Sequence, residues 1–298
     1  MKKIIFFLNF IVSLVSGETE VLFTPSKKTY SYFINLLQNA KKSIYISTYS
    51  ISPDFLNFLK GKKLDIKIVC EYGEDKNLQI KKIENKNLFH SKFLIIDEEV
   101  SIITSANLTF SNFYKNHNNL VIIKDKNLSR YLIKKFDSFW NNYNYTENFK
   151  DRNIEIWFSP ENDCEGIIER EIKNSTNSIN FATFSFTDTN IAEKIIEKRN
   201  EGILVKGIIE SYNIFPHSVF YLLLSYGCDV RKSCISGFLH DKFFIIDREK
   251  VITGSFNPTK SAKENVELLC LINDRNTAEE FYREWRYLYL FKSTKEDI

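Results

Sequence analysis

Two short segments of the sequence carry the same polar residues at the same spacing. Each reads H-x-K-x4-D, includes an apolar run, and is followed after six further residues by a turn of small residues that ends in Asn. A single histidine in a strand is usually structural, but identical spacing in two copies, in a chain with only four histidines, indicates a site. The shared residues are His90, Lys92, Asp97, Ser105 and Asn107, and His240, Lys242, Asp247, Ser255 and Asn257.

These residue types together suit the cleavage of a phosphate ester. Lysine binds phosphate as a point charge, and Ser and Asn supply oriented donors. Histidine exists as imidazole and as imidazolium near neutral pH, so one ring can attack phosphorus while the other protonates the leaving oxygen. This chemistry needs no metal ion or other cofactor, and we expect none. The predicted phosphate-binding residues are Lys92, Lys242, Ser105, Asn107, Ser255 and Asn257.

The apolar runs 93–96 and 243–246 predict two short buried strands. Because strand side chains alternate between faces, His90 and Lys92 share one face while Asp97 falls on the other, and the second copy behaves alike. We therefore expect Asp97 and Asp247 to serve the site by orienting the strand ends rather than by carrying protons. The hairpin that follows each strand can return Ser and Asn to the His–Lys pair.

On these two motifs the sequence resembles the phospholipase D superfamily, and the resemblance covers nearly the whole chain after the N-terminal segment. It implies that the paired motifs meet across a pseudo-two-fold axis and form one active site. One departure is visible: Thr104 stands where the family usually has Gly, whereas the second copy keeps Gly254. The exact shape of the first turn is therefore open.

Similarity between the two halves extends beyond the motifs. Residues 22–25 match residues 157–160, and a closing helix around Trp140 matches one around Trp285. Alternating strand and helix patterns predict an α/β fold of two pseudo-symmetric phospholipase D-like lobes, each a mixed sheet flanked by helices. The predicted boundaries are 18–145 and 154–298, joined by the polar stretch 141–153.

Residues 1–17 combine a basic start, an apolar run too short to span a bilayer comfortably, and small residues at the end. This pattern is typical of a secretory signal peptide, with an uncleaved N-terminal anchor as the alternative. We therefore expect a secreted or periplasmic protein and leave association with a membrane open. Without this segment basic and acidic residues are nearly balanced, which gives no strong attraction to nucleic acid.

Two further features leave alternatives open. Cys228 and Cys234 are close enough in sequence to form a disulfide in an oxidising compartment, and free thiols are equally compatible with the pattern. The second half also carries extra residues, in the aromatic-rich stretch 211–236. They form either an added helix that packs on the lobe or an apolar wall that accepts acyl chains beside the site.

The resemblance also implies which residue orients each histidine. In the family, a residue after the Asn turn tends to bind Nδ1 of the histidine of its own lobe; aligned on the following apolar strand, it is Asn119 in the first half and Glu267 in the second. A carboxylate favours imidazolium, whereas an amide orients the ring without adding charge. We therefore expect His90, held by Asn119, as nucleophile and His240, held by Glu267, as general acid.

The predicted function is a metal-independent phosphodiesterase that hydrolyses phospholipid head groups through a phosphohistidine. Near-balanced charge and aromatic-rich segments favour a phospholipid at a membrane surface over nucleic acid. A metal-independent endonuclease and a phosphatidyltransferase use the same chemistry and remain alternatives. A non-enzymatic binding module is a further alternative, although both motifs are intact. Two motifs in one chain favour a monomer.

Overall fold

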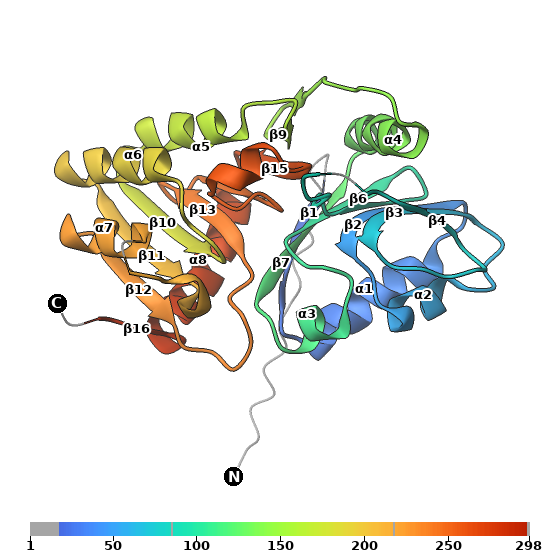
Figure 1. The fold of residues 1–298 in the computed structure, drawn as a ribbon, viewed down its shortest axis with the longest axis horizontal. Coiled ribbons are helices and arrows are strands. Elements are labelled where there is room, and N and C mark those ends of the chain that lie inside the picture. The colour runs from blue at the N-terminus through green and yellow to red at the C-terminus, as the bar shows by residue number, and fades with distance from the viewer. Residues whose placement is uncertain (1–17, 85, 217, 297–298) are drawn as a thin grey trace, which may run out of the picture.

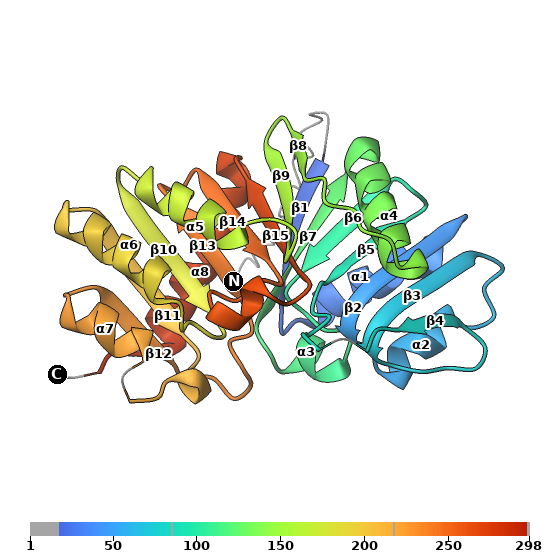
Figure 2. The same cartoon turned by 45° about the horizontal axis from the view of Figure 1, so that its top comes forward.

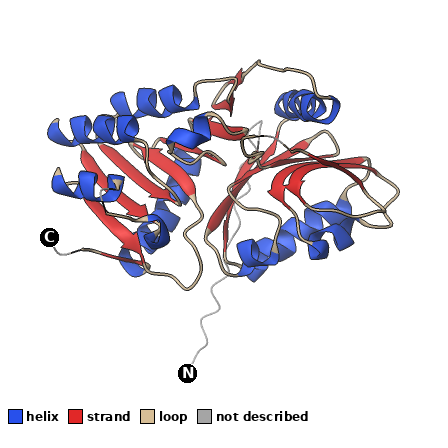
Figure 3. Cartoon of the chain, in the orientation of Figure 1, coloured by secondary structure: helices blue, strands red, loops and turns tan. Residues whose placement is uncertain are grey.

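The computed structural model describes residues 18–296, apart from residues 85 and 217. The chain forms two lobes that lie side by side, each built on one sheet with helices on both of its faces (Figures 1 and 3). The predicted α/β fold is therefore confirmed. The proposed signal peptide, residues 1–17, lies outside the described residues.

The first lobe contains seven strands and four helices. They are β1 (Glu18–Thr24), α1 (Lys27–Asn39), β2 (Ser43–Ser50), α2 (Pro53–Leu59), β3 (Asp65–Tyr72), β4 (Gln79–Lys82), β5 (Phe93–Ile96), β6 (Val100–Thr104), α3 (Phe110–Tyr114), β7 (Asn118–Lys124) and α4 (Lys126–Asn141).

The second lobe contains nine strands, four α-helices and two short 3₁₀ helices. They are β8 (Phe149–Asp151), β9 (Ile154–Ser159), α5 (Cys164–Lys173), β10 (Ser178–Thr183), α6 (Thr189–Asn200), β11 (Leu204–Ile209), η1 (Ser211–Asn213), α7 (Val219–Ser225), β12 (Asp229–Ser233), β13 (Lys242–Ile246), β14 (Lys250–Gly254), η2 (Lys260–Lys263), β15 (Glu267–Ile272), α8 (Arg275–Phe291) and β16 (Ser293–Thr294).

The two sheets have the same strand order at their centres. The first runs β1-β7-β6-β5-β2-β3-β4, and the second, read from its β8 edge, runs β8-β9-β15-β14-β13-β10-β11-β12-β16. Strands β9 to β12 of the second sheet therefore correspond one by one to β1 to β4 of the first, and β13 to β15 to β5 to β7. In both sheets the motif strand, β5 or β13, lies antiparallel to its neighbours at the sheet centre.

One detail differs from the sequence expectation, and two alternatives that it left open are decided. The stretch predicted as a linker, 141–153, contains β8, which pairs with β9 and adds an edge to the second sheet. Within the added stretch 211–236, α7 buries Phe220 and Leu223 in the second lobe, as an added helix would. Cys228 and Cys234 are both free thiols.

One hydrophobic core continues across the lobe boundary. It contains Phe89 and Phe93 from the first lobe together with Phe158, Phe243 and Phe281 from the second, all almost fully buried. Burying a phenylalanine side chain contributes about 1.5–3 kcal/mol, so this shared core holds the lobes in a fixed relation. A fixed relation is what a site built from both lobes requires.

Candidate active site

The two motif histidines lie at the lobe boundary, just before β5 and β13. The His90 N–H donates to the carbonyl of Val266 at 2.9 Å, and the His240 N–H donates to the carbonyl of His117 at 2.8 Å. Each histidine is therefore anchored to the strand entry of the opposite lobe. Figure 2 shows this boundary, with β7 of the first lobe and β15 of the second on its two sides.

The ring of His90 is oriented by a carboxylate from the other lobe. Its Nδ1 lies 2.8 Å and 2.9 Å from the two carboxylate oxygens of Glu267, which is the first residue of β15 and 1% exposed. The ring of Tyr49 packs edge-on against the imidazole, with centroids 5.4 Å apart. Donation from Nδ1 to the carboxylate leaves Nε2 as the free nitrogen.

The ring of His240 is oriented by an amide, also from the other lobe. Its Nδ1 lies 2.8 Å from Oδ1 of Asn118. The Asn118 amide nitrogen donates to the hydroxyl of Thr24 and the carbonyl of Asn112, so its oxygen is the atom that faces the imidazole. Nδ1 of His240 is therefore the donor, and Nε2 is again the free nitrogen. Phe184 packs against this ring at 4.8 Å.

The predicted orienting pairs were wrong in two ways. Glu267 holds the histidine of the opposite lobe rather than its own, and Asn119 contacts neither histidine. Asn119 instead donates to Asp241 at 2.8 Å and accepts from Thr253 at 2.8 Å. The equivalent of Glu267 is Asn118, because a shift of one residue along a strand turns the side chain to the other face.

Both motif lysines are clamped in the same way. The ammonium groups of Lys92 and Lys242 each donate to the carbonyl of their own motif histidine at 2.8 Å, and both residues are at most 3% exposed. An ammonium has three N–H groups, so each lysine retains donors for a phosphate. Lys92 also lies over the ring of Tyr49, and Lys242 over that of Phe184.

Burial and mutual repulsion lower the pKa values of the basic groups of the site. Burial lowers the pKa of His90 to about 4, although Glu267 acts in the opposite direction. Burial lowers the pKa of Lys242 to about 7 and holds that of Lys92 well below its usual value. The pKa of His240 is also held well below its usual value, by burial and by both lysines. An anion bound among these groups favours their charged forms.

The carboxylate of Glu267 is the one acid that binds a motif histidine directly among the described residues. Burial raises its pKa, but the charge and hydrogen bond of His90 and the charge of Lys92 outweigh that effect, so its net pKa is lowered. It therefore stays ionised next to His90. No comparable negative charge lies on Nδ1 of His240, whose partner is the neutral amide of Asn118.

The hydroxyls of the two turn serines bind neighbouring strands. Ser105 accepts the N–H of Asn119 and donates weakly to Asn118, and Ser255 accepts the N–H of Leu268. Both serines are fully buried. Their hydroxyls thus brace the strands that carry Asn118 and Glu267, and their predicted role in phosphate binding stays a prediction.

The turn asparagines Asn107 and Asn257 remain candidates for phosphate binding. Each is only partly buried, and each side-chain oxygen is shielded without a hydrogen-bond partner. This arrangement is the same in both lobes, as expected from their matched spacing. Their predicted role stays a prediction.

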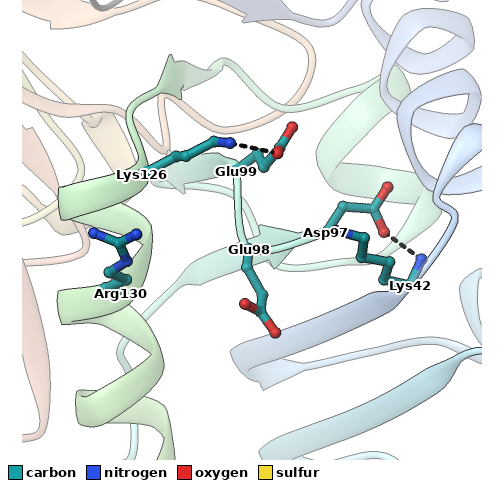
Figure 4. Close-up of a pocket in the computed structure, with 6 residues that line it drawn as sticks. All are labelled: Lys42, Asp97, Glu98, Glu99, Lys126 and Arg130. Carbon is teal, nitrogen blue, oxygen red and sulfur yellow. Dashed lines mark hydrogen bonds and ion pairs between the residues drawn. The ribbon is translucent and has the colours of Figure 1, made fainter.

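The motif aspartates lie at the far end of the motif strands from the histidines. Asp97 accepts the backbone N–H groups of residues 41–43 at 2.6–3.1 Å, and Asp247 accepts those of residues 176–178 at 2.7–2.8 Å. Figure 4 shows Asp97 in a small surface pocket whose lining mixes acidic and basic side chains. Both aspartates therefore hold the strand ends through backbone contacts, as expected for residues that orient the strands.

Two positioning residues were missed. The carboxylate of Glu71, in β3, accepts the N–H of Phe89 at 2.9 Å, and that of Glu210, directly after β11, accepts the N–H of Leu239 at 2.6 Å. Each glutamate therefore fixes the residue that precedes a motif histidine. The available signal was the acid at the end of the equivalent strand in both halves, which resembles an ordinary exposed strand end.

Within the described part of the chain, no group of three or more His, Cys, Asp or Glu side chains is arranged to hold a metal ion. Over the same residues, no helix combines the length and apolarity needed to cross a membrane.

Fold and site together define an α/β protein with one buried, cation-rich active site shared by two similar lobes. A family model described as "Cardiolipin synthase, PLD-like domain" matches residues 33–140 and 168–289, which include both His–Lys motifs. The chain therefore belongs to the PLD-like domain family, within the phospholipase D superfamily.

Known relatives agree with this assignment. A phospholipase D of Rickettsia prowazekii is 35% identical over 130 residues, which cover 43% of this chain and 63% of that protein. The matched region thus spans less than two thirds of the length of this relative. Among solved structures, phosphatidylserine synthase of Haemophilus influenzae aligns with a TM-score of 0.70 at 13% identity, covering 92% of this chain and 87% of that one.

The same fold occurs in a polyphosphate kinase of Porphyromonas gingivalis. It aligns with a TM-score of 0.74 at 15% identity and covers 94% of this chain but 48% of that one. At such identities the likeness concerns the fold alone.

Proposed function

We propose that the chain is a phosphodiesterase that acts through a phosphohistidine. The observation that carries the proposal is the pair of motif imidazoles, each bound at Nδ1 by the opposite lobe and each left with a free Nε2. The charge of His90 acts on His240, and that of Lys242 on both histidines, so the two motifs occupy one electrostatic site. In this proposal one phosphorus centre contacts both rings.

In the proposed reaction, His90 is the nucleophile and His240 the general acid. The anionic substrate favours the imidazolium form of His240, in which both nitrogens carry a proton. Nε2 of His90 then forms a bond to phosphorus, the bond from phosphorus to the leaving alcohol breaks, and the Nε2 proton of His240 goes to the leaving oxygen. Water then attacks the phosphohistidine, His240 accepts its proton, and the phosphorus–nitrogen bond breaks. Lys92 and Lys242 stabilise the charge on the non-bridging oxygens.

The reason for this division differs from the one that the sequence suggested. Attack on phosphorus places positive charge on the nucleophilic ring, and the carboxylate of Glu267 stabilises that charge on His90. A general acid must give its proton away, and a ring held by the neutral amide of Asn118 does so more readily than one held by a carboxylate. Both partners therefore favour His90 as nucleophile.

Phospholipid is the substrate class that the rim of the site supports best. From His240, ring contacts lead through Phe184 to Phe238 and then Tyr212, which are 41% and 71% exposed. On the other side, contacts lead from His90 through Tyr49 to Tyr72, which is 56% exposed. Exposed aromatic rings of this kind suit the interface of a bilayer.

The test compares lipid and nucleic acid as substrates in the presence of a chelator. Wild type, His90→Ala and His240→Ala are assayed for head-group release from mixed phospholipid vesicles and for scission of single-stranded DNA. We expect head-group release by wild type alone and no scission. Scission without head-group release would replace the lipid assignment with a nuclease, and activity retained by both variants would overturn the site itself.

A further inference from the structure

A second pocket, of about 380 Å³, lies behind the wall that holds His240. His117 lines this pocket, and its carbonyl accepts the N–H of His240. Because strand side chains alternate and the next residue, Asn118, faces His240, the side chain of His117 points away from the active site. The pocket and the active site therefore share one wall but open on opposite sides of it.

His117 is a buried polar side chain with an unsatisfied nitrogen. It is 8% exposed, and its Nδ1 has no hydrogen-bond partner. The nearest acidic oxygen, in Glu284 of α8, lies 3.8 Å away, which is too far for a hydrogen bond. A buried polar atom without a partner is destabilising, and a ligand in the pocket would provide the missing partner.

The other polar groups of the pocket favour an anion. Lys115 and Lys292 line it, and neither has an ion-pair partner among the described residues. Ser26, the N-cap of the thirteen-residue helix α1, lines it as well, so the positive end of a helix faces the same space. Glu284 is the single acid among the lining residues, and the buried carboxyl of Asp241 also interacts electrostatically with His117 and Glu284.

The first lobe allows a comparison, because at the position equivalent to this pocket apolar side chains fill the space. Val266 corresponds to His117, and Phe139 of α4 corresponds to Glu284. Phe139 packs against Phe89 at 5.0 Å between ring centroids. The fold therefore does not demand a polar pocket here; the exchange of an apolar pair for His117 and Glu284 creates it.

We propose that this pocket binds a small organic phosphomonoester. The phosphoryl group would lie between His117, Lys115, Lys292 and the start of α1. Its carbon part would pack on the rings that line the remaining wall, those of Phe23, Tyr114 and Tyr287. This binding does not depend on the reaction proposed for the neighbouring site.

The experiment follows the imidazole nitrogen signals of the four histidines by NMR during titration with glycerol 3-phosphate, dihexanoyl phosphatidic acid and inorganic phosphate. A site behind the wall shifts the His117 signal, whereas binding in the active site shifts those of His90 and His240. We expect the His117 signal to move with an organic phosphate. Movement of the other two signals alone, or equal affinity for inorganic phosphate, overturns the proposal.

Three variants sharpen the result. Lys292→Met is expected to weaken binding about tenfold, because it removes one charged contact, while Lys63→Met, at an exposed lysine outside both sites, should not change affinity. The double variant His117→Val with Glu284→Phe copies the residues of the opposite lobe and should abolish binding, measured by calorimetry. Unchanged affinity in a folded double variant, judged by its circular dichroism, would contradict the assignment.

Discussion

The two lobes hold their catalytic groups with the same backbone but with different charge. Each places a histidine before its central strand, clamps a lysine on that histidine's carbonyl, and orients the ring from the other lobe. The partner is a carboxylate, Glu267, for His90 and an amide, Asn118, for His240. The proposed division of roles therefore depends on one difference in charge between two otherwise similar lobes.

A second difference lies in how firmly each histidine loop is fixed. Glu210 is 3% exposed and accepts four hydrogen bonds, from Ser211, Tyr212, Ser233 and Leu239. Its counterpart Glu71 accepts one, from Phe89, and is partly exposed. The loop of the proposed general acid is therefore the more constrained of the two. The predictions that follow test these differences.

The largest effect is expected from the histidines themselves. His90→Ala and His240→Ala should each lower kcat by about 10⁴-fold or more, because catalytic groups that act as a unit are not additive. With a p-nitrophenyl diester, whose leaving group needs no protonation, only His240→Ala should accumulate a phosphoenzyme, detected by mass spectrometry. A phosphoryl group found on residue 240 of the His90→Ala variant would reverse the roles.

Exchange of the orienting residues should rank next. Glu267→Gln keeps a hydrogen-bond acceptor but removes the charge that stabilises His90 during attack, and we expect a loss of about 10²–10⁴-fold in kcat. Asn118→Ala removes orientation but no charge, and a loss of about tenfold is expected. Steady-state kinetics on one substrate compare the two. Equal losses would show that the charge of Glu267 does not distinguish the lobes.

The fold and the four central side chains could be predicted because their signals are local. Apolar periodicity marks strands and helices, and duplicated spacing marks His90, Lys92, His240 and Lys242. The residues that orient the histidines could not be predicted. Asn118 and Asn119 are adjacent amides, and only the strand register decides which one faces an imidazole ring. Each orienting residue also binds the histidine of the opposite lobe. This contact depends on how the two lobes pack together, and no local sequence pattern indicates it.

The roles of the turn serines and of the strand-end glutamates could not be predicted from the sequence either, because they also depend on tertiary contacts. A serine beside an active site suits both a phosphate contact and a brace for a neighbouring strand. The structure shows the second arrangement, because the hydroxyls of Ser105 and Ser255 accept the backbone N–H groups of Asn119 and Leu268. In the sequence, Glu71 and Glu210 look like ordinary solvated residues at strand ends. Only the structure shows that they accept hydrogen bonds from the residues that precede the motif histidines.

The strand-end glutamates provide the third test. Glu210→Gln leaves a buried amide in place of a carboxylate that accepts from four donors, and we expect about a tenfold loss in kcat through misplacement of His240. Glu71→Gln should cost only a few-fold. KM should stay nearly unchanged in both variants, because a residue that only positions the histidine does not bind substrate. Thermal unfolding serves as the control that both variants fold. A larger loss of kcat for Glu71→Gln would show that the loop of His90, rather than that of His240, depends more on its glutamate.

The lysines provide a test through pH. The pKa of Lys242 is lowered to about 7, chiefly by burial, so in the free protein its positive charge is present below pH 7 and is lost as the pH rises through that value. We therefore expect KM to rise severalfold between pH 7 and 9. Lys242→Arg stays protonated across this range and should give a flat KM. A wild-type KM that does not change with pH would remove Lys242 from phosphate binding.

The smallest effect on activity is expected from the motif aspartates, although they belong to the same motifs as the histidines. Asp97→Asn and Asp247→Asn should leave kcat within about twofold, because these side chains bind backbone N–H groups at the far strand ends. Their effect is on stability, where each should cost about 1 kcal/mol in the free energy of unfolding at pH 7.

The stability effect has a defined pH dependence. Burial raises the pKa of both carboxyls, but the backbone N–H donors outweigh it, so the folded-state pKa lies below the usual value. The stabilisation is then present above the unfolded-state pKa, about 4, and is lost as the pH falls through the folded-state value. Urea unfolding at pH 7 and pH 3 should show the gap between wild type and each variant narrowing in acid. A gap of constant size would show that the carboxylate charge does not contribute to the strand-end contacts.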